Sequence, residues 1–297
     1  MRNLPLPSRE EDRSDLELAL TQHRYRDEVK GYHATEEEVI ALLAIYDHYD
    51  ETFGAPSDAK KGPALGTDVK DALHSAFGFV YEGRRLKHLR QNLLKGVDRC
   101  PMCGIFPAKE LDHFLPRSVY KPLAIYARNL VPLCHACNNI KSDRGAGQLA
   151  DQFVHAYFDI LPDIDFIIAT IALDGEALSF GFHVAEGDGL TTPLAAKLTY
   201  QLDTLDLEKR FSTELNTYLS SLAPALEMVW EYGGTEDVKT YLAKQIVMET
   251  KTHHRNDWRV ATLKALRLDQ DFCAGGFRAV FATPDAMKDE IDELVTA

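Results

Sequence analysis

Hydrophobic and polar residues follow the period of an α-helix along much of the chain. The clearest pattern begins after Thr35, where Val39, Leu42 and Tyr46 recur at helical spacing. Glu38 stands three residues after Thr35, which is the capping-box arrangement found where helices begin. The pattern therefore predicts a helix that starts near Thr35 and turns an apolar stripe toward the core.

Helical patterns also cover residues 68–96, with an interruption near Gly83, as well as 149–163 and most of 193–268. These stretches predict a mainly helical protein. Residues 1–33 are polar and charged, so the sequence predicts a frayed N-terminal arm there.

Two stretches carry strand patterns. Residues 164–173 and 178–186 flank the turn DGEA and have the hydrophobic and polar pattern of strands. This predicts a β-hairpin. Residues 105–114 predict a second hairpin, which is followed by a loop and by a helix from about Asn138. The expected fold class is α+β and mainly helical, with a small β-containing centre and an additional β-hairpin.

The chain has 297 residues, of which 45% are hydrophobic. This is enough to bury a sizeable core in one or two compact domains. No apolar run approaches the roughly 18 residues of a membrane-spanning helix. Residues 1–13 also lack the apolar region of a secretory signal. We therefore expect a cytoplasmic protein without membrane contact.

Four of the five cysteines form two C-x-x-C pairs. Cys100 and Cys103 make the first pair, Cys134 and Cys137 the second, and 30 residues lie between the pairs. Two thiolates held two residues apart can bind one ion, and two such turns complete a tetrahedral zinc site. The spacing predicts one structural Zn²⁺, whereas Cys273 is expected to be an isolated buried residue.

Candidate chemistry lies between and just after the cysteine pairs. Asp112 and His113 stand in the run ELDHFLP, and Asn138 follows the last cysteine. Hard divalent cations prefer oxygen ligands such as those of Asp112 and Asn138. A neutral imidazole at His113 could take a proton from an attacking water. Together these groups predict phosphodiester hydrolysis. Neighbouring strand residues point to opposite faces, so we expect an irregular backbone at Asp112 and His113.

The Asp112-His113 pair, Asn129 in NLVPLCHACN, Asn138 in CNNIKSD and the enclosing cysteine pairs together resemble the HNH, or ββα-metal, endonucleases. The resemblance implies a ββα-metal core in which His113 is the general base and Asp112 a metal ligand. Asn129 would pin the loop between the strands, and Asn138 would be the second ligand in an H-N-N variant. Lys141 would approach a phosphate from the helix.

The resemblance covers about 45 of the 297 residues. It implies a catalytic Mg²⁺ or Mn²⁺ beside the structural Zn²⁺, and nucleic acid, most often DNA, as the substrate. The arrangement is also similar to the HNH nuclease subunits of bacterial anti-phage systems that work with an ATPase. That similarity implies a role in anti-phage defence and an ATPase or other protein partner.

Charge divides the chain into three regions. Residues 1–83 carry 9 basic and 17 acidic side chains, residues 84–145 carry 12 and 4, and residues 146–297 carry 12 and 25. The positive charge is thus concentrated around the proposed site, as a phosphate-binding face requires. We expect a helical N-terminal region at 1–83, a nuclease core at 84–147, and a mainly helical region at 148–297.

Basic residues in two places are predicted to contact nucleic acid as phosphate positioners. One group precedes the first cysteine pair, and the other lies on the loop between the predicted strands. The first group consists of Arg84, Arg85, Lys87 and Arg90, and the second of Arg117, Lys121 and Arg128.

Three alternatives stay open from the sequence alone. Asn138 could cap a helix that begins near Cys137 instead of binding a metal. The whole region could be a non-catalytic zinc module that binds nucleic acid or protein. It could also be a toxin-type RNase, because the same chemistry acts on any phosphodiester.

Overall fold

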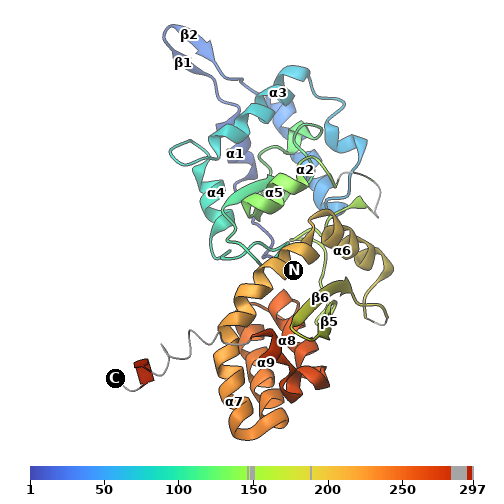
Figure 1. The fold of residues 1–297 in the computed structure, drawn as a ribbon. Coiled ribbons are helices and arrows are strands. Elements are labelled where there is room, and N and C mark those ends of the chain that lie inside the picture. Colours follow the sequence, from blue (N-terminus) through green and yellow to red (C-terminus); the bar gives the residue numbers. More distant parts are fainter. Residues whose placement is uncertain (146, 148–150, 188, 282–292, 296–297) are drawn as a thin grey trace. The chain divides into compact units, whose positions relative to one another are not determined.

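The computed structural model describes residues 1–145, 147, 151–187, 189–281 and 293–295 (Figure 1). They divide into two compact units. Unit 1 comprises residues 1–162 and 188–207, and unit 2 comprises residues 163–187 and 208–297. The fold is α+β with small antiparallel sheets, as the pattern predicted.

Unit 1 combines helices with two pairs of short antiparallel strands, β1 with β2 and β3 with β4. In chain order its elements are α1 (Asp12–Ala19), β1 (His23–Tyr25), β2 (Glu28–Lys30), α2 (Glu36–Glu51), α3 (Thr67–Ala76), α4 (Lys87–Leu94), β3 (Glu110–His113), β4 (Leu130–Leu133), α5 (His135–Lys141) and α6 (Thr192–Thr204). Short 3₁₀ helices cover Asp58–Lys61, Phe77–Phe79, Lys121–Leu123 and Ala127–Asn129.

The helix predicted after Thr35 is confirmed. Helix α2 begins at Glu36, the Thr35 side chain accepts a hydrogen bond from the Glu38 amide, and the Glu38 carboxylate accepts one from the Thr35 amide. The interrupted pattern near Gly83 is confirmed as well, because α3 and α4 are separate helices.

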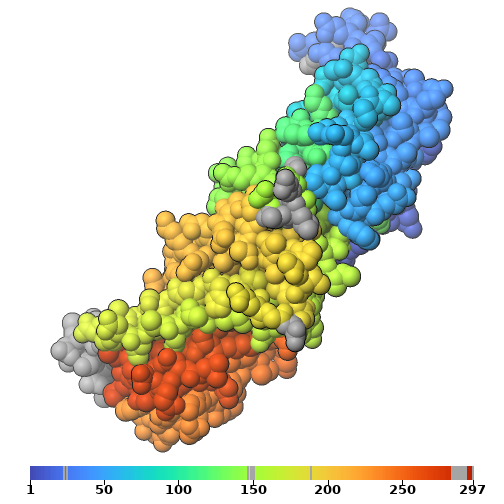
Figure 2. All heavy atoms as spheres, turned by 90° about the vertical axis from the view of Figure 1, so that its right-hand side faces the viewer, coloured from blue at the N-terminus to red at the C-terminus, as the bar shows by residue number. Residues whose placement is uncertain are grey.

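The predicted frayed arm at residues 1–33 is wrong. The segment contains α1, whose Leu16 is fully buried together with Leu20, and the hairpin β1–β2, which projects from the rest of unit 1 in both views (Figure 1, Figure 2). Asp15 accepts a hydrogen bond from His88 of α4 at 2.6 Å. Asp15, one of the charged residues that suggested solvent exposure, therefore has a partner in another helix.

The hairpin predicted within residues 105–114 is also wrong. Strand β3 pairs with β4, so that Asp112 lies opposite Val131 and His113 opposite Leu130. Residues before β3 belong to the first cysteine turn instead, because the Cys100 amide donates to the Phe106 carbonyl. Strands β3 and β4 with helix α5 form a ββα unit.

No α-helix forms in the described part of the predicted helical run 149–163, of which residues 149 and 150 lie outside the described residues. Its groups make long-range contacts instead. The Tyr157 hydroxyl donates to the Leu130 carbonyl at 2.8 Å, and the Val154 amide donates to the Gln201 side chain at 3.2 Å. Tertiary contacts have overridden the local pattern.

Unit 2 contains the predicted hairpin and the C-terminal helices. Its elements are β5 (Ile167–Asp174), β6 (Ala177–Val184), α7 (Leu207–Thr252), α8 (Trp258–Leu268), a π-helical turn (Phe272–Gly276) and α9 (Phe277–Val280). Helix α7 is broken at Gly234, whose φ of 64° is outside the helical region. In the described parts of the chain, every helix is too short or too polar to cross a membrane.

Candidate functional site

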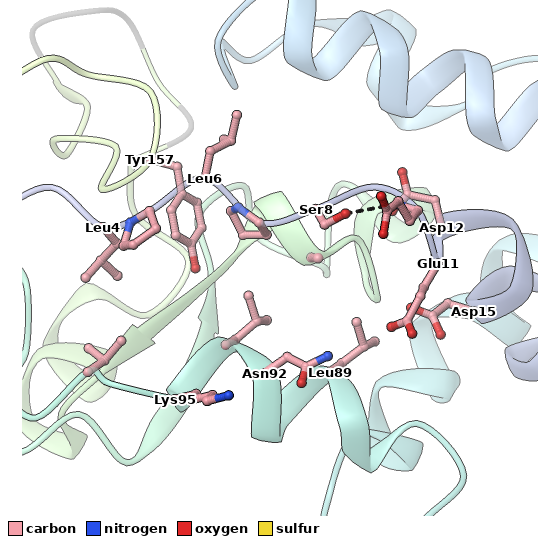
Figure 3. A pocket seen from close by; sticks show the side chains of 16 residues that line it. Leu4, Leu6, Ser8, Glu11, Asp12, Asp15, Leu89, Asn92, Lys95 and Tyr157 are labelled. Carbon is pink, nitrogen blue, oxygen red and sulfur yellow. Dashed lines mark hydrogen bonds between the residues drawn. The ribbon is translucent and has the colours of Figure 1, made fainter.

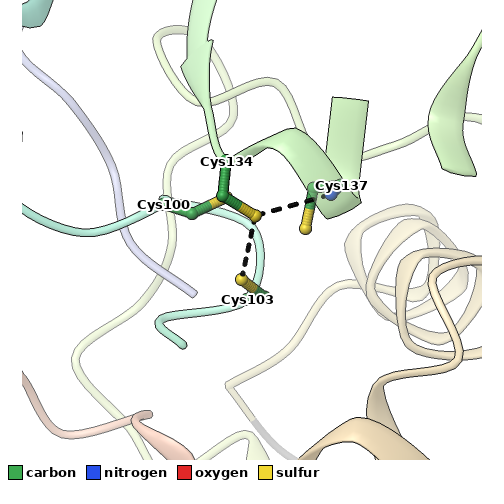
Figure 4. A group of neighbouring side chains, drawn as sticks. All are labelled: Cys100, Cys103, Cys134 and Cys137. Carbon is green, nitrogen blue, oxygen red and sulfur yellow. Dashed lines mark hydrogen bonds between the residues drawn. The ribbon is translucent and has the colours of Figure 1, made fainter. Parts of the chain in front are cut away.

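The four paired cysteines meet at one point of unit 1. Cys100 and Cys103 come from the turn before β3, Cys134 caps α5, and Cys137 lies in its first turn (Figure 4). All four are buried, their sulfur atoms lie within 4.8 Å of one another, and the Cys103 and Cys134 sulfurs are 3.8 Å apart. A tetrahedral ion with metal–sulfur bonds of about 2.3 Å would separate its sulfur ligands by about 3.8 Å. The donor set fits a structural Zn²⁺.

The surroundings of two of the four sulfurs, those of Cys103 and Cys134, favour the thiolate, whereas the pKa values of Cys100, chiefly through burial, and of Cys137, chiefly through hydrogen bonding with Cys100, are raised. Backbone amides of Ile105 and Cys137 donate to the sulfurs of Cys103 and Cys134, each at 3.4 Å. A hydrogen bond with Cys100 is the main cause of a lowered pKa at Cys103. A hydrogen bond with Cys100 is also the main cause at Cys134, whose pKa is lowered to about 7. Thiolates are the form that binds a metal.

Strand β3 directs the proposed catalytic residues to two faces. Glu110 and Asp112 are half-buried and contact α5, whereas Leu111 and His113 are buried on the opposite face. The strand pairs regularly with β4 through His113. The irregular backbone expected at Asp112 and His113 is therefore absent from this described strand, because the regular ladder extends to its last residue.

Asp112 forms an ion pair with Lys141. Its Oδ2 atom is buried and lies 2.8 Å from Lys141 Nζ. Burial raises the pKa of Asp112, although the charge of Lys141 opposes the shift. The carboxylate therefore already pairs with one cation, and a metal ion would have to use its remaining lone pairs.

Lys141 is placed differently from the sequence expectation. Its side chain is 1% exposed, and its ammonium donates to the His113 carbonyl at 2.7 Å besides pairing with Asp112. Its ammonium is thus engaged by two groups of the protein and is not available to a phosphate. The residue that was expected to meet substrate instead ties α5 to β3.

His113 is held in one tautomer. Its ring is 6% exposed and packs edge-on against Phe77, with 4.4 Å between the ring centres. Nε2 lies 2.9 Å from the Ala124 carbonyl. Because a carbonyl can only accept, Nε2 carries the proton and Nδ1 keeps its lone pair. Burial lowers the pKa of His113 to about 3, so the ring is neutral.

Asn129 organises the loop that holds His113. The side chain is fully buried, and its oxygen accepts from the Leu115 amide at 2.8 Å and the Tyr49 hydroxyl at 3.1 Å. Its amide group donates to the carbonyls of Leu115 and Leu123 at 3.1 and 3.2 Å. Leu123 immediately precedes Ala124, whose carbonyl contacts His113, so Asn129 fixes that carbonyl through its neighbour.

Replacing Asn129 by alanine is expected to lower the free energy of unfolding by about 3–5 kcal/mol, because several buried polar groups would lose their partners. Urea unfolding followed by circular dichroism measures this. Asn139→Ala is the control, since Asn139 is exposed on α5. A loss below about 1 kcal/mol for Asn129→Ala would contradict this role of the side chain.

Asn138 does not cap α5. The helix begins at His135 and is capped by the Cys134 sulfur, so Asn138 lies inside the first turns. Its Nδ2 donates to Glu110 at 2.6 Å, and His135 Nδ1 lies 2.9 Å from the other Glu110 oxygen. The sequence interpretation missed Glu110. It stands two residues before Asp112, and the strand alternation puts both on one face.

Most cations predicted to contact phosphate are engaged within the protein. Lys121 pairs with Asp71 at 2.5 Å, and Arg128 pairs with Asp50 at 2.6 Å. Arg117, Arg85 and Arg90 donate to the backbone carbonyls of His74, Ala19 and Lys109, respectively. Arg84 and Lys87 are exposed. Arg117, Lys121 and Arg128 thus help to close the fold around the loop.

One cavity of unit 1, of about 410 Å³, lies between the N-terminal segment and α4. Glu11, Asp12 and Asp15 gather at one end, and Leu4 and Tyr157 lie at the other (Figure 3). Such a concentration of carboxylates repels a polyanion. This cavity is therefore a poor candidate for a nucleic-acid site.

A second cavity of about 550 Å³ opens beside α5, and we call it the Tyr81 pocket. Its lining includes two cationic residues and the two neighbouring asparagines of the helix. The residues that line it are Tyr81, Arg90, Lys109, Glu110, Leu111, His135, Asn138, Asn139 and Ser142. Among these, Asn138 links the cavity to the predicted metal site.

The ββα unit carries a four-cysteine cluster that fits Zn²⁺, together with Asp112, His113 and Asn138. Residues 100–144 match the family model for HNH endonuclease. The chain is also similar to Protein ea31 of Escherichia phage lambda, with 24% identity over 198 residues that cover 62% of this chain and 66% of that protein. No solved structure matches the chain.

Proposed function

We propose that the protein is a metal-dependent endonuclease that hydrolyses phosphodiester bonds, with DNA as its substrate. The fixed tautomer of His113 carries the proposal. Its Nε2 proton is committed to the Ala124 carbonyl at 2.9 Å, so Nδ1 is the basic atom. The family match over residues 100–144 supports the class of reaction.

Asp112 and Asn138 are the residues that would hold Mg²⁺ or Mn²⁺. The Asp112 carboxylate pairs with Lys141 through Oδ2, so its remaining lone pairs would accept the cation. Because the Glu110 carboxylate can only accept, the Asn138 atom that faces it is the donor nitrogen, and the amide oxygen is left for a cation. When bound, the ion supplies charge that polarises the phosphoryl oxygen and stabilises the leaving group.

His113 would act from the opposite side of β3. In phosphoryl transfer, the attacking and leaving oxygens lie roughly in line through phosphorus. A phosphate group bound at the edge of β3 would then have Asp112 on one side and His113 on the other. Nδ1 of His113 accepts the proton of the attacking water while the Ala124 carbonyl holds the ring.

Incubation with plasmid DNA and with total RNA, with and without added Mg²⁺, tests the proposal. We expect Mg²⁺-dependent cutting of DNA. Absence of cutting of either substrate favours a non-catalytic zinc module, and cutting of RNA alone favours a toxin-type RNase.

Replacing Asn138 by alanine is expected to lower Mg²⁺-dependent cleavage at least about 100-fold, while the melting temperature changes little, because the residue is half-buried and does not cap α5. Cleavage rates across a Mg²⁺ titration and thermal unfolding measure the two effects. Asn216→Ala is the control, because Asn216 is exposed on α7 in unit 2, and it is expected to keep the wild-type Mg²⁺ dependence. Unfolding of Asn138→Ala would argue for a structural role instead.

A further inference from the structure

The Tyr81 pocket lies beside the proposed metal ligand Asn138 and also near the proposed base. Phe77 links the two places, because its ring centre lies 5.9 Å from that of Tyr81 and 4.4 Å from that of His113. Asn138 itself lines the pocket. A group bound in this cavity would therefore sit next to the reacting phosphate.

Tyr81 presents an aromatic surface to the pocket. The residue is 54% exposed, and its hydroxyl has no hydrogen-bond partner among the described residues. The Tyr81 ring makes an edge contact with Phe77, and the guanidinium carbon of Arg90 lies over the ring, 5.8 Å from its centre. Single exposed aromatic residues are common. This one differs because it lines a cavity next to predicted catalytic groups.

Positive charge at the pocket is available to an anion. The Arg90 guanidinium donates to the Lys109 carbonyl, which fixes it at the pocket wall. The Lys109 ammonium is exposed and has no ion pair within the described ranges. The carboxylate of Glu110 is occupied by Asn138 and His135, at 2.6 and 2.9 Å. Arg90 keeps further N–H donors besides the one that it gives to the Lys109 carbonyl, so Arg90 and Lys109 can both reach a phosphate beside the single carboxylate of Glu110.

We propose that the Tyr81 pocket binds one unpaired nucleotide of the substrate strand, with the base stacked on Tyr81 and a phosphate held by Arg90 and Lys109. Both faces of a base inside a duplex are covered by its neighbours. A ring in a cavity can therefore stack only on a base that has left the helix. This inference rests on the proposed nuclease function and specifies its substrate as single-stranded or locally unpaired nucleic acid.

The test uses the full-length chain with His113→Ala to prevent cleavage. The probes are a fully paired DNA duplex and the same duplex with one extra, unpaired 2-aminopurine, whose fluorescence falls when it stacks. We expect the unpaired probe to bind at least about 10-fold more tightly and to be quenched. Adding Tyr81→Ala should remove the quenching and the preference, whereas Tyr81→Phe should keep both.

Tyr232→Ala is the matched control, because Tyr232 is 87% exposed and lies in unit 2. It should keep the quenching and the preference. Equal binding of the two probes, or quenching that survives Tyr81→Ala, overturns the inference. Failure of the nuclease proposal appears separately, as absence of Mg²⁺-dependent cleavage by the wild-type protein on every substrate.

Discussion

Replacing His113 by alanine is expected to reduce the rate of DNA cleavage about 100- to 10,000-fold, the range that a general base contributes. The loss follows from removal of the Nδ1 lone pair, since Nε2 is bound to the Ala124 carbonyl. The rate is measured in single-turnover cleavage of a labelled oligonucleotide at saturating Mg²⁺. Binding of the oligonucleotide should change little, because the ring is buried.

Loss of packing must be separated from loss of chemistry. The His113 ring contacts Phe77, so the alanine variant will also lose roughly 2–4 kcal/mol of stability. Cleavage is therefore assayed well below the melting temperature of the variant. His48→Ala is the control, because His48 is half-buried in α2 and bonds Ser57. A His113→Ala variant that cuts at the wild-type rate would contradict the assignment.

Replacing Cys134 by serine is expected to remove the bound zinc and to unfold the ββα unit. Zinc binding contributes an apparent 10–16 kcal/mol or so in small zinc domains, which is comparable with the whole stability of a typical domain. Elemental analysis should show about one zinc per chain in the wild type and little in the variant. Thermal unfolding by circular dichroism gives the loss of structure.

Cys273→Ser is the matched control for the zinc prediction. Cys273 is buried in unit 2 and is the one cysteine of the chain outside the two pairs. Its thiol contacts the Leu266 carbonyl and lies outside the cysteine cluster, so the zinc content of Cys273→Ser should stay at the wild-type level. A Cys134→Ser variant that keeps its zinc and its melting temperature would refute the four-thiolate site.

The two proposed metal sites are linked through one residue. Cys134 directly follows β4, caps α5 with its sulfur and belongs to the cysteine cluster. Asn138 follows one helical turn later. We therefore expect zinc bound by the cysteine cluster to fix the start of α5, and with it the position of the Asn138 amide. An ATPase partner and a role in anti-phage defence stay predictions from the resemblance.

The sequence by itself determined the features that depend on local spacing. The two C-x-x-C pairs predicted a cysteine cluster, and the capping box at Thr35 predicted the start of a helix. Alternation around the turn DGEA predicted the β5–β6 hairpin. Each of these patterns involves residues that act together over a few positions, so neighbours in sequence were sufficient to define them.

Only the tertiary structure decided which charged groups are free. Lys121 and Arg128 look like phosphate contacts in sequence, but Asp71 and Asp50, from distant helices, pair with them. Lys109, which the sequence interpretation passed over, is exposed beside Asn138. The residue type determines the sign of a charge, whereas its availability depends on partners that only folding brings within a few ångströms.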